Sequence, residues 1–484
     1  NQPIGEAKGV HPGRVVWIHD PNATDWDGPG IDGKYSWQPE HTSQKNVAAM
    51  VAKSIRELSG CDTDGQAWEA IFRYFNQRHG RGNVGYVPGE KITIKVNLTT
   101  CNAGHADWIF DPDTYEKIDY LDKSDTSPQI IVALLRQLVF KAGVDPNDIA
   151  VGDTLCIFPT QWWDICHGEF PNVTFFDPLG KLGRVESRPS TIPQYWSTTD
   201  AVNKAQDYIP ELYAQADYLI NLSVLKAHER AGITLCAKNH YGSYNRRPAA
   251  SNYFNLHESL ANLSSSEGQH RGLVDIMGHP DMGGKTLLYL IDSLYGGEGW
   301  AGTPSKFANE PFNNDWPSSI FLSQDPVAIE SVGLDILWEQ WPTMVQIAAV
   351  DDYLKEAALA PNSFSGTSYD PDGDSVPLDS LGVYARWNNS TDRQYSRNLG
   401  TGDGIELVYV KMQYRTGNIN SDQSIDVIDL VQLAETWLWV GLPEQITEDI
   451  QPDGRIDLQD FATLSQSWAC LLYTSDAADD SSVV

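Results

Sequence analysis

Long apolar runs are missing from this sequence of 484 residues. The longest apolar stretches, such as residues 130–135, fall well short of the ~18 consecutive apolar residues that a membrane-spanning helix needs. We therefore expect a soluble protein with no transmembrane segment. Hydrophobic residues still make up 41% of the chain, which is enough for a buried core in each of about two or three domains.

Cysteine is scarce, and no two cysteines have the C-x-x-C spacing. The six are Cys61, Cys101, Cys156, Cys166, Cys236 and Cys470. Iron–sulfur clusters and structural zinc sites usually draw on such close pairs, so we predict neither of them. Cys156 and Cys166 can pair only under oxidising conditions, and buried free thiols are the simpler interpretation.

Positive charge is also in short supply. The chain has 34 Lys and Arg against 65 Asp and Glu, a net charge of −31. Such a protein repels the phosphates of nucleic acids and of anionic membranes, so we predict no nucleic-acid partner. The glycine-rich segment 296–299 lacks the spacing of a dinucleotide or P-loop fingerprint, which argues against a nucleotide cofactor and indicates a turn or lid.

Strand-like and helical segments alternate along most of the chain. Short runs rich in β-branched or apolar residues predict strands at 14–18, 91–96, 149–151, 173–176, 218–222, 287–291, 319–322 and 405–410. Helical periodicity marks 46–58, 67–75 and 128–142. This alternation predicts an α/β domain over residues 1–411 with a mostly parallel, helix-covered sheet, followed by a linker at 412–416.

Two acidic loops follow this linker in the same register. In the first, oxygen ligands at positions 1, 3, 5, 9 and 12 of an EF-hand-type loop are Asn418, Asn420, Asp422, Asp426 and Asp429, and position 7 offers the carbonyl of Ser424. The second loop repeats the pattern with Asp449, Gln451, Asp453, Asp457 and Asp460, and with the carbonyl of Arg455. Calcium prefers such oxygen cages, and two loops in register make a coincidence improbable.

An apolar helical run follows each loop, at residues 430–438 and 461–468, so that each run can bury one face against the other. Residues 417–469 therefore resemble a type I dockerin, a small all-α calcium-binding domain. The resemblance implies calcium as cofactor and a cohesin-like or cell-surface protein as partner. The chain begins at Asn1 without a leader, which suits a processed secreted protein or a fragment, and we expect an extracellular, cell-surface or periplasmic location.

The segment departs from the dockerin pattern at three places. Gln423 replaces the glycine of loop position 6 and Asn418 replaces the first aspartate, which predicts weaker calcium binding at the first loop. Residues 427–428 and 458–459 lack the small hydroxyl pairs that dockerins usually present, which argues against an ordinary cellulosomal cohesin. Residues 470–484 resemble a translated sequencing adapter and are excluded from the functional interpretation.

The densest polar cluster of the large domain lies at residues 221–242. It contains Lys226, His228, Lys238 and Asn239, and it directly follows the predicted strand 218–222. Lys95 and Asn97 end another predicted strand, and Asp153 follows a third. Because parallel strands gather ligands beyond their carboxyl ends, we expect these side chains to share one crevice that binds an anion.

Two details of this cluster stay open in the sequence. A helix that starts at Gly232 would add the positive end of its dipole, and His228 would be the best general base near neutral pH. The alternative is that the lysines form surface ion pairs and that His228 is merely half-buried.

These residues carry a resemblance to a family catalogued as domain of unknown function 362 (DUF362). The matching motifs are Lys95-Val-Asn97, Gly152-Asp153, residues 221–239, Leu290-Ile-Asp292 and Asp325-Pro-Val-Ala328, within residues 14–340. Many relatives carry ferredoxin-like cysteine clusters, which this chain lacks, so we expect no electron transfer.

The sequence thus predicts an extracytoplasmic protein with a calcium-binding attachment module and a domain that binds or transforms an acidic ligand, either a small molecule or a polymer. Whether that domain is an enzyme stays open. One alternative is a non-catalytic binding or assembly protein. A second is a polysaccharide-processing hydrolase, which follows from the dockerin resemblance alone, because no pair of carboxylates can be assigned acid and nucleophile roles.

Overall fold

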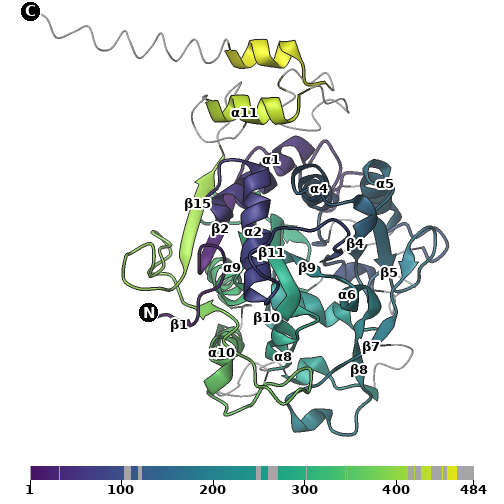
Figure 1. The fold of residues 1–484 in the computed structure, drawn as a ribbon, viewed down its shortest axis with the longest axis vertical. Helices are drawn as coiled ribbons and strands as arrows, with labels where there is room; N and C mark the ends of the chain where they lie inside the picture. The colour runs from purple at the N-terminus through teal and green to yellow at the C-terminus, as the bar shows by residue number, and fades with distance from the viewer. Residues whose placement is uncertain are drawn as a thin grey trace, which may run out of the picture.

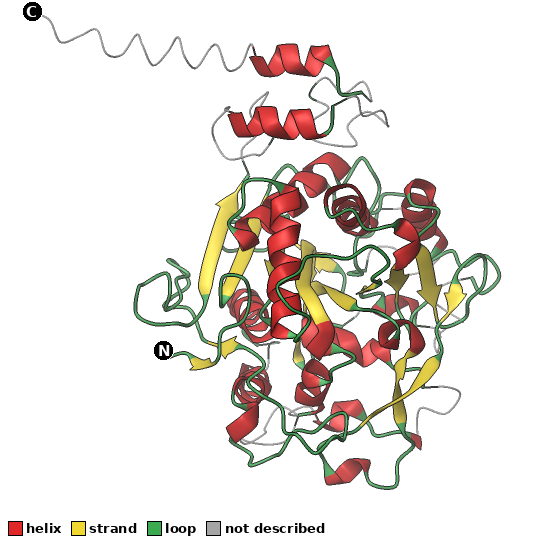
Figure 2. Ribbon diagram, viewed as in Figure 1, coloured by secondary structure: helices red, strands yellow, loops and turns green. Residues whose placement is uncertain are grey.

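The computed structural model describes residues 2–31, 33–102, 111–117, 123–246, 252–259, 271–300, 302–343, 345, 347–412, 419, 427–437, 450 and 455–465. Within these residues an eleven-stranded sheet organises the fold (Figures 1 and 2). Its strand order is β15-β2-β13-β11-β9-β3-β4-β5-β6, with β10 paired to β9 and β12 to β11.

Neighbouring strands of this sheet run parallel except in four pairings. Their bounds are β2 (Arg14–His19), β3 (Ile92–Lys95), β4 (Ile149–Gly152), β5 (Thr174–Asp177), β6 (Val185–Glu186), β9 (Tyr218–His228), β10 (Gly232–Thr234), β11 (Thr286–Gly297), β12 (Pro304–Ser305), β13 (Ser319–Ser323) and β15 (Glu406–Lys411). β13 is antiparallel to both of its neighbours, and β10 and β12 pair antiparallel at the margin. The expected large, mostly parallel sheet of an α/β fold is therefore confirmed.

The other described elements lie outside this sheet. Two small antiparallel sheets pair β1 (Ile4–Gly5) with β14 (Val383–Tyr384) and β7 (Pro189–Gln194) with β8 (Asp207–Pro210). The α-helices are α1 (Gln44–Ser59), α2 (Asp64–Arg78), α4 (Pro128–Arg136), α5 (Thr160–Glu169), α6 (Glu211–Ala214), α7 (Cys236–Asn239), α8 (Gly272–Gly278), α9 (Pro326–Gln340), α10 (Ile347–Ala358) and α11 (Val427–Glu435). None of these described helices is long and apolar enough to cross a membrane.

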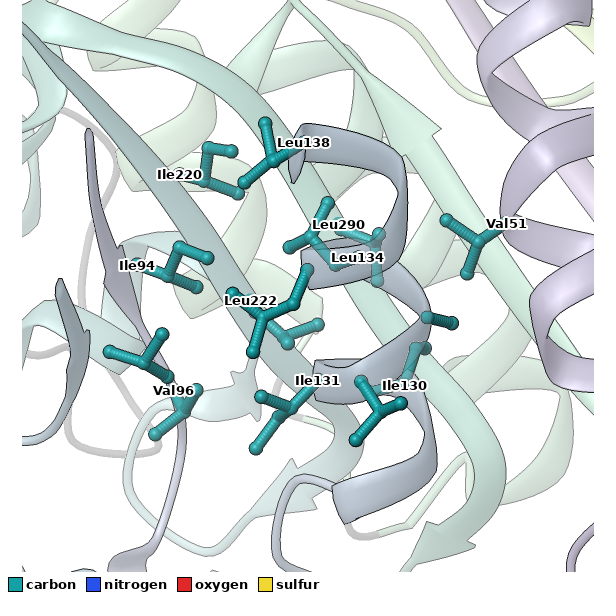
Figure 3. Close-up of a cluster of buried hydrophobic side chains, with 14 of the residues drawn as sticks. Val51, Ile94, Val96, Ile130, Ile131, Leu134, Leu138, Ile220, Leu222 and Leu290 are labelled. Carbon is teal, nitrogen blue, oxygen red and sulfur yellow. The ribbon is translucent and has the colours of Figure 1, made fainter. Parts of the chain in front are cut away.

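Both faces of the sheet are buried, because alternate residues of each central strand enter different cores. Leu290 of β11 packs into one core with α1, α2 and α4, whereas Ile291 packs into the other with α9 and α10. Figure 3 shows the first core, where α4 and its continuation meet β3, β9 and β11 through Ile94, Ile130, Ile131, Leu134, Leu138, Ile220, Leu222 and Leu290. Burial on both faces is the expected arrangement for a parallel sheet.

Local sequence signals set the ends of the helices. Ser43 caps α1 by accepting a hydrogen bond from the backbone N–H of Asn46, and Gly60 ends that helix at φ +70°, a conformation that favours glycine. Asp325 caps α9, where its Oδ1 accepts from the N–H groups of Val327 (3.0 Å) and Ala328 (2.8 Å). The Asp325-Pro-Val-Ala328 motif is thus a helix start with Pro326 in the first turn.

One sequence expectation was wrong in the centre of the sheet, because β9 does not end at Leu222 but continues to His228. The sequence left open whether a helix starts at Gly232, and in the structure residues 232–234 form β10 and the helix α7 begins at Cys236. The reason is backbone pairing: β10 folds back on β9 with Thr234 opposite Lys226 and Gly232 opposite His228, so the chain stays extended. Of the glycine-rich segment 296–299, for which a turn or lid was expected, Gly296 and Gly297 instead belong to β11 and pair with β12, whereas residues 298 and 299 form a bend after that strand.

The Asp325 cap generates a stability prediction. Its carboxylate is fully buried and also accepts from the backbone N–H groups of Lys8 and Val383, so Asp325→Ala leaves several buried donors without an acceptor. We expect the free energy of unfolding to fall by about 2 kcal/mol or more, since each such loss costs about 1–3 kcal/mol. Urea denaturation followed by tryptophan fluorescence measures this change.

Two variants control this experiment. Asp325→Asn keeps one acceptor oxygen and should recover part of the loss, whereas Asp403→Ala changes an exposed aspartate and should leave the midpoint unchanged. Equal stability of Asp325→Ala and the native chain would contradict the capping role.

Candidate functional site

A cavity of about 1180 Å³ lies at the carboxyl ends of β3, β4 and β9. These strands flank a topological switch point, because the chain passes from β3 to β4 on one side and from β9 to β11 on the other. The predicted site residues that line the cavity are Lys95, Asn97, Asp153, His228, Lys238 and Asn239. Lys226, the remaining member, lies behind the wall and is fully buried.

Lys95 and Asp153 form a buried ion pair in the floor of the cavity. The Nζ of Lys95 lies 2.7 Å from Oδ2 of Asp153 and donates to Oδ1 of Asn239 at 2.9 Å. The other carboxylate oxygen of Asp153 accepts from the backbone N–H groups of Leu155 and Cys156. Both carboxylate oxygens of Asp153 are therefore engaged, and the residue holds Lys95 in place.

The side-chain amides of Asn239 and Asn97 link the ion pair in the cavity floor to Lys226. Oδ1 of Asn239 accepts from Nδ2 of Asn97 at 3.1 Å, and Oδ1 of Asn97 accepts from Nζ of Lys226 at 2.9 Å. Lys226 also donates to the carbonyl of Ser124 at 2.9 Å. Burial lowers the pKa of Lys226 to about 8, and the nearby Asp125 partly opposes that shift.

Asn221, which the sequence cluster contained but which was not singled out, fixes the orientation of this chain. Its Oδ1 accepts from Nδ2 of Asn239 at 2.9 Å, and its own Nδ2 donates to the carbonyl of Cys236 at 2.8 Å. Because the amide nitrogen of Asn239 is used in this way, its oxygen must face Lys95 and Asn97.

His228 does not fit the expected role of a general base. Its Nδ1 accepts hydrogen bonds from the backbone N–H groups of Arg230 (3.0 Å) and Ala231 (3.1 Å), which leaves the ring proton on Nε2. Burial, and next the charge of Lys238, lowers the pKa of His228 to about 2. The imidazole therefore stays neutral and can donate a hydrogen bond through Nε2, but it cannot take up a proton near neutral pH.

Lys238 is the lysine of this cluster with a free amine. It is half-buried, its Nζ lies 4.2 Å from the centre of the Tyr241 ring, and it makes no hydrogen bond or ion pair with any residue that the structure describes. Desolvation by the surrounding protein, and next the charges of Lys226 and Lys95, lowers the pKa of Lys238 to about 7, although Glu229 acts in the opposite direction.

The cavity wall is cationic although the protein as a whole is acidic. Its charged side chains are Lys95, Lys204, Arg230, Lys238 and Arg246 against Asp153 and Glu229, and Tyr241, Tyr244, Tyr253 and Trp300 add aromatic surface. Arg246 is paired with Asp207 at 2.6 Å, and Asp153 is neutralised by Lys95. Sequence reasoning missed Lys204, Arg246, Tyr244 and Tyr253, because nothing in the sequence links them to the strand ends, and it did not single out Tyr241 within the cluster 221–242.

Thr234 gives the cavity an additional polar group. Its side chain is 4% exposed, lines the cavity, and its Oγ1 has no hydrogen-bond partner among the described residues. A buried hydroxyl without a partner is costly, so this oxygen is available to a bound molecule.

Only part of the predicted calcium site falls on described residues. Asp429, Arg455, Asp457 and Asp460 are described, whereas Asn418, Asn420, Asp422, Ser424, Asp426, Asp449, Gln451 and Asp453 lie outside the described residues. Asp429 accepts from the backbone N–H of Ile419, and Asp460 accepts from that of Asp457 at 2.9 Å. Elsewhere in the described chain, Asp370, Asp372 and Asp374 bring carboxylate oxygens within 4.8 Å of one another, as acidic turns often do without binding a metal.

The described parts of the C-terminal segment pack through equivalent residues of its two halves. Ile419, Leu433, Ile456 and Leu464 form a small core with Leu430 and Ile450, and Leu433 and Leu464 come from α11 and from the helical residues 458–465. Ile419 and Ile450 hold the same position in the two predicted loops. The two halves thus bury one face against the other.

The fold and this site define an α/β protein with a cationic pocket at the carboxyl edge of a mostly parallel sheet. Residues 124–335 match the model of a domain of unknown function, DUF362, and this part of the chain is a DUF362 domain. No curated protein matches the sequence, and no family match supports the dockerin resemblance of residues 417–469. The match is narrower than the expected 14–340, so Lys95 and Asn97 come from outside it.

The buried pair in the cavity floor generates a second prediction. Lys95→Met leaves the carboxylate of Asp153 buried without its cation, and we expect a loss of about 3–5 kcal/mol in the free energy of unfolding. Adding Asp153→Asn removes the unpaired charge, so the double variant should lose less than the two single variants together. Urea denaturation of all three chains measures the coupling.

The exposed pair of Lys34 and Asp27 supplies the control for this cycle, since Lys34→Met should leave the denaturation midpoint unchanged. Additive losses in the Lys95 and Asp153 variants would contradict the proposed coupling.

Proposed function

We propose that the DUF362 domain binds a small acidic molecule in the cavity at the carboxyl ends of β3, β4 and β9. The observation that carries this proposal is the unpaired ammonium of Lys238 in a cationic pocket of a protein with net charge −31. A half-buried cation without an anionic partner is unfavourable, and a bound carboxylate or phosphate would relieve it.

Several donors around Lys238 support an anionic ligand. His228 presents an Nε2–H, Thr234 offers a hydroxyl, and Arg230 adds a second positive group on the wall. Hydrogen bonds to charged groups contribute about 1.5–3 kcal/mol each when water is excluded, which would allow a small anion to bind with useful affinity. Glycoside hydrolysis finds no support here, because Asp153 is tied to Lys95 and leaves Glu229 as the one other carboxylate on the described wall.

Anion binding should depend on Lys238 and on pH. Its pKa of about 7 means that the ammonium is charged at pH 6 and largely neutral at pH 9, so affinity for sulfate, whose charge is constant over this range, should fall as pH rises. Lys238→Met should weaken binding at pH 6 by roughly 10-fold or more and should flatten this pH dependence. Isothermal calorimetry on the full chain measures both effects.

Lys181→Met is the matched control, because Lys181 is exposed and does not line the cavity. It should bind sulfate with the native affinity and pH dependence. Native affinity in Lys238→Met would contradict the proposed role of the cavity.

We further propose that residues 417–469 form a dockerin-like, calcium-binding module that attaches the protein to a cohesin-like or cell-surface partner outside the cytoplasm. The packing of Leu433 against the equivalent Leu464 supports the duplicated architecture, and the buried carboxylates of Asp429 and Asp460 hold equivalent positions at the starts of the two helices. These two carboxylates stand at position 12 of the predicted loops, where EF-hand-type loops place their last ligand.

This module should bind calcium through both loops, and the second loop should bind more tightly. Calorimetry on the full chain should show two sites, of which Asp453→Ala removes the tighter and Asp422→Ala the weaker. Asp372→Ala, which changes an acidic turn of the large domain, is the control and should leave both sites intact. A chain without calcium binding, or one with two equally tight sites, would contradict the prediction.

A further inference from the structure

The three lysines of the predicted cluster differ in the partners of their amines, and two of them, Lys95 and Lys238, line the cavity. Lys95 donates to Asp153 and Asn239, and Lys226 donates to Asn97 and the carbonyl of Ser124. Lys238 lies against the ring face of Tyr241 and has no hydrogen-bond acceptor among the described residues. Its nitrogen lone pair is therefore available to the cavity whenever the amine is neutral.

Two neutral imidazoles flank this amine. The rings of His228 and His257 stack with centres 6.1 Å apart, and both line the cavity with Lys238. Lys238 and His257 both contact Tyr241, because the Lys238 Nζ lies 4.2 Å from the centre of that ring and the His257 ring centre lies 5.5 Å from it. The charge of Lys238 is, after burial, the largest influence that lowers the pKa of each histidine. A neutral histidine with its proton on Nε2 can polarise a carbonyl group without transferring a proton to it.

Two further cations of the cavity wall can bind a carboxylate group of the same ligand at a second position in the cavity. Arg230 and Lys204 line the same cavity, and the described part of the wall gives neither an ion-pair partner. A molecule with a carbonyl near Lys238 and His228 can therefore keep its carboxylate on these groups. A carboxylate bound there would restrict the orientations in which the carbonyl carbon can meet the amine.

We propose that Lys238 is a nucleophile that forms an imine with an oxo acid, a small molecule that carries both a carbonyl and a carboxylate group. This proposal rests on the proposed function, because the same pocket must first bind the carboxylate. Beyond anion binding, it assigns a substrate class, the oxo acids, and a reacting atom, the amine nitrogen of Lys238.

The step balances without an oxidant or reductant. The lone pair of the Lys238 amine attacks the carbonyl carbon, and one amine proton moves to the carbonyl oxygen to give a carbinolamine. A proton from solvent then converts the hydroxyl into a departing water while the nitrogen lone pair forms the C=N bond of a protonated imine. Nearby cations and desolvation favour the neutral amine that this attack requires, as the lowered pKa of Lys238 indicates.

Reductive trapping on the full chain tests this proposal. The protein is incubated with pyruvate or glyoxylate and sodium cyanoborohydride, and intact mass with peptide mapping locates the reduced adduct. The expected result is one adduct per chain at Lys238, lost in Lys238→Arg and kept in Lys181→Met. Malonate, which has carboxylates but no ketone or aldehyde carbonyl, should suppress the adduct by occupying the pocket.

Lys238→Arg separates the two levels of the proposal, because arginine keeps the positive charge but cannot form the imine under these conditions. It should still bind malonate by calorimetry, and its thermal unfolding shows whether the variant is folded. Binding of malonate and pyruvate to the native chain without an adduct at Lys238, or with adducts scattered over exposed lysines, overturns the imine and leaves anion binding intact. Absence of binding by both probes overturns the imine and the anion site together.

Discussion

The Lys95 side chain, at the carboxyl end of β3, is almost completely buried. The architecture of the site follows from the way in which neighbouring groups compensate this buried positive charge. A buried charge of this kind is stable only when an opposite charge and a full set of hydrogen bonds accompany it. Asp153 supplies the charge from the end of β4, and Asn239 supplies an oxygen from α7. The adjacent strands β3 and β4 and the short helix α7 are thereby held at one point.

This compensation also constrains the backbone around it. A Cβ atom at Gly242 would lie 3.2 Å from Oδ1 of Asp153 and 3.5 Å from Nζ of Lys95, so the turn after α7 approaches the pair closely because the residue is glycine. The hairpin of β9 and β10 feeds into α7, and it sets Lys226 and Thr234 opposite each other beside the same network. The position of Lys238 on α7 is therefore a consequence of how Lys95 is neutralised.

The DUF362 domain at residues 124–335 does not build this site alone. β3 lies between β9 and β4 in the sheet, although Ile92–Lys95 precedes the matched residues in the chain. Asn97, which links the floor to Lys226, comes from the same outside segment. The flanking strands β2 and β15 likewise lie outside the matched residues and extend the same sheet.

Sequence reasoning brought most of the cluster together because the rule about strand carboxyl ends is geometric. It placed Lys95, Asp153 and the site residues after the predicted strand 218–222 at one edge without knowing their contacts, and the structure brings all of them except the buried Lys226 into the wall of one cavity. It failed on the length of β9, because a strand buried on both faces shows no alternation that could mark its end. It also missed the chemistry of His228. The position of the ring proton is decided by the backbone N–H groups of Arg230 and Ala231, in the short turn between β9 and β10.

The contrast between the acidic composition of the chain and the cationic cavity bears on the size of the ligand that we propose. At physiological ionic strength charges are screened over roughly 8 Å, so a small anion inside the cavity is governed by the wall and not by the distant surface. A long polyanion would extend beyond the cavity and meet the excess negative charge of the exterior, where each added group is repelled. Electrostatics therefore favours a small acidic molecule over an acidic polymer, with the aromatic side of the cavity left for whatever uncharged part that molecule carries.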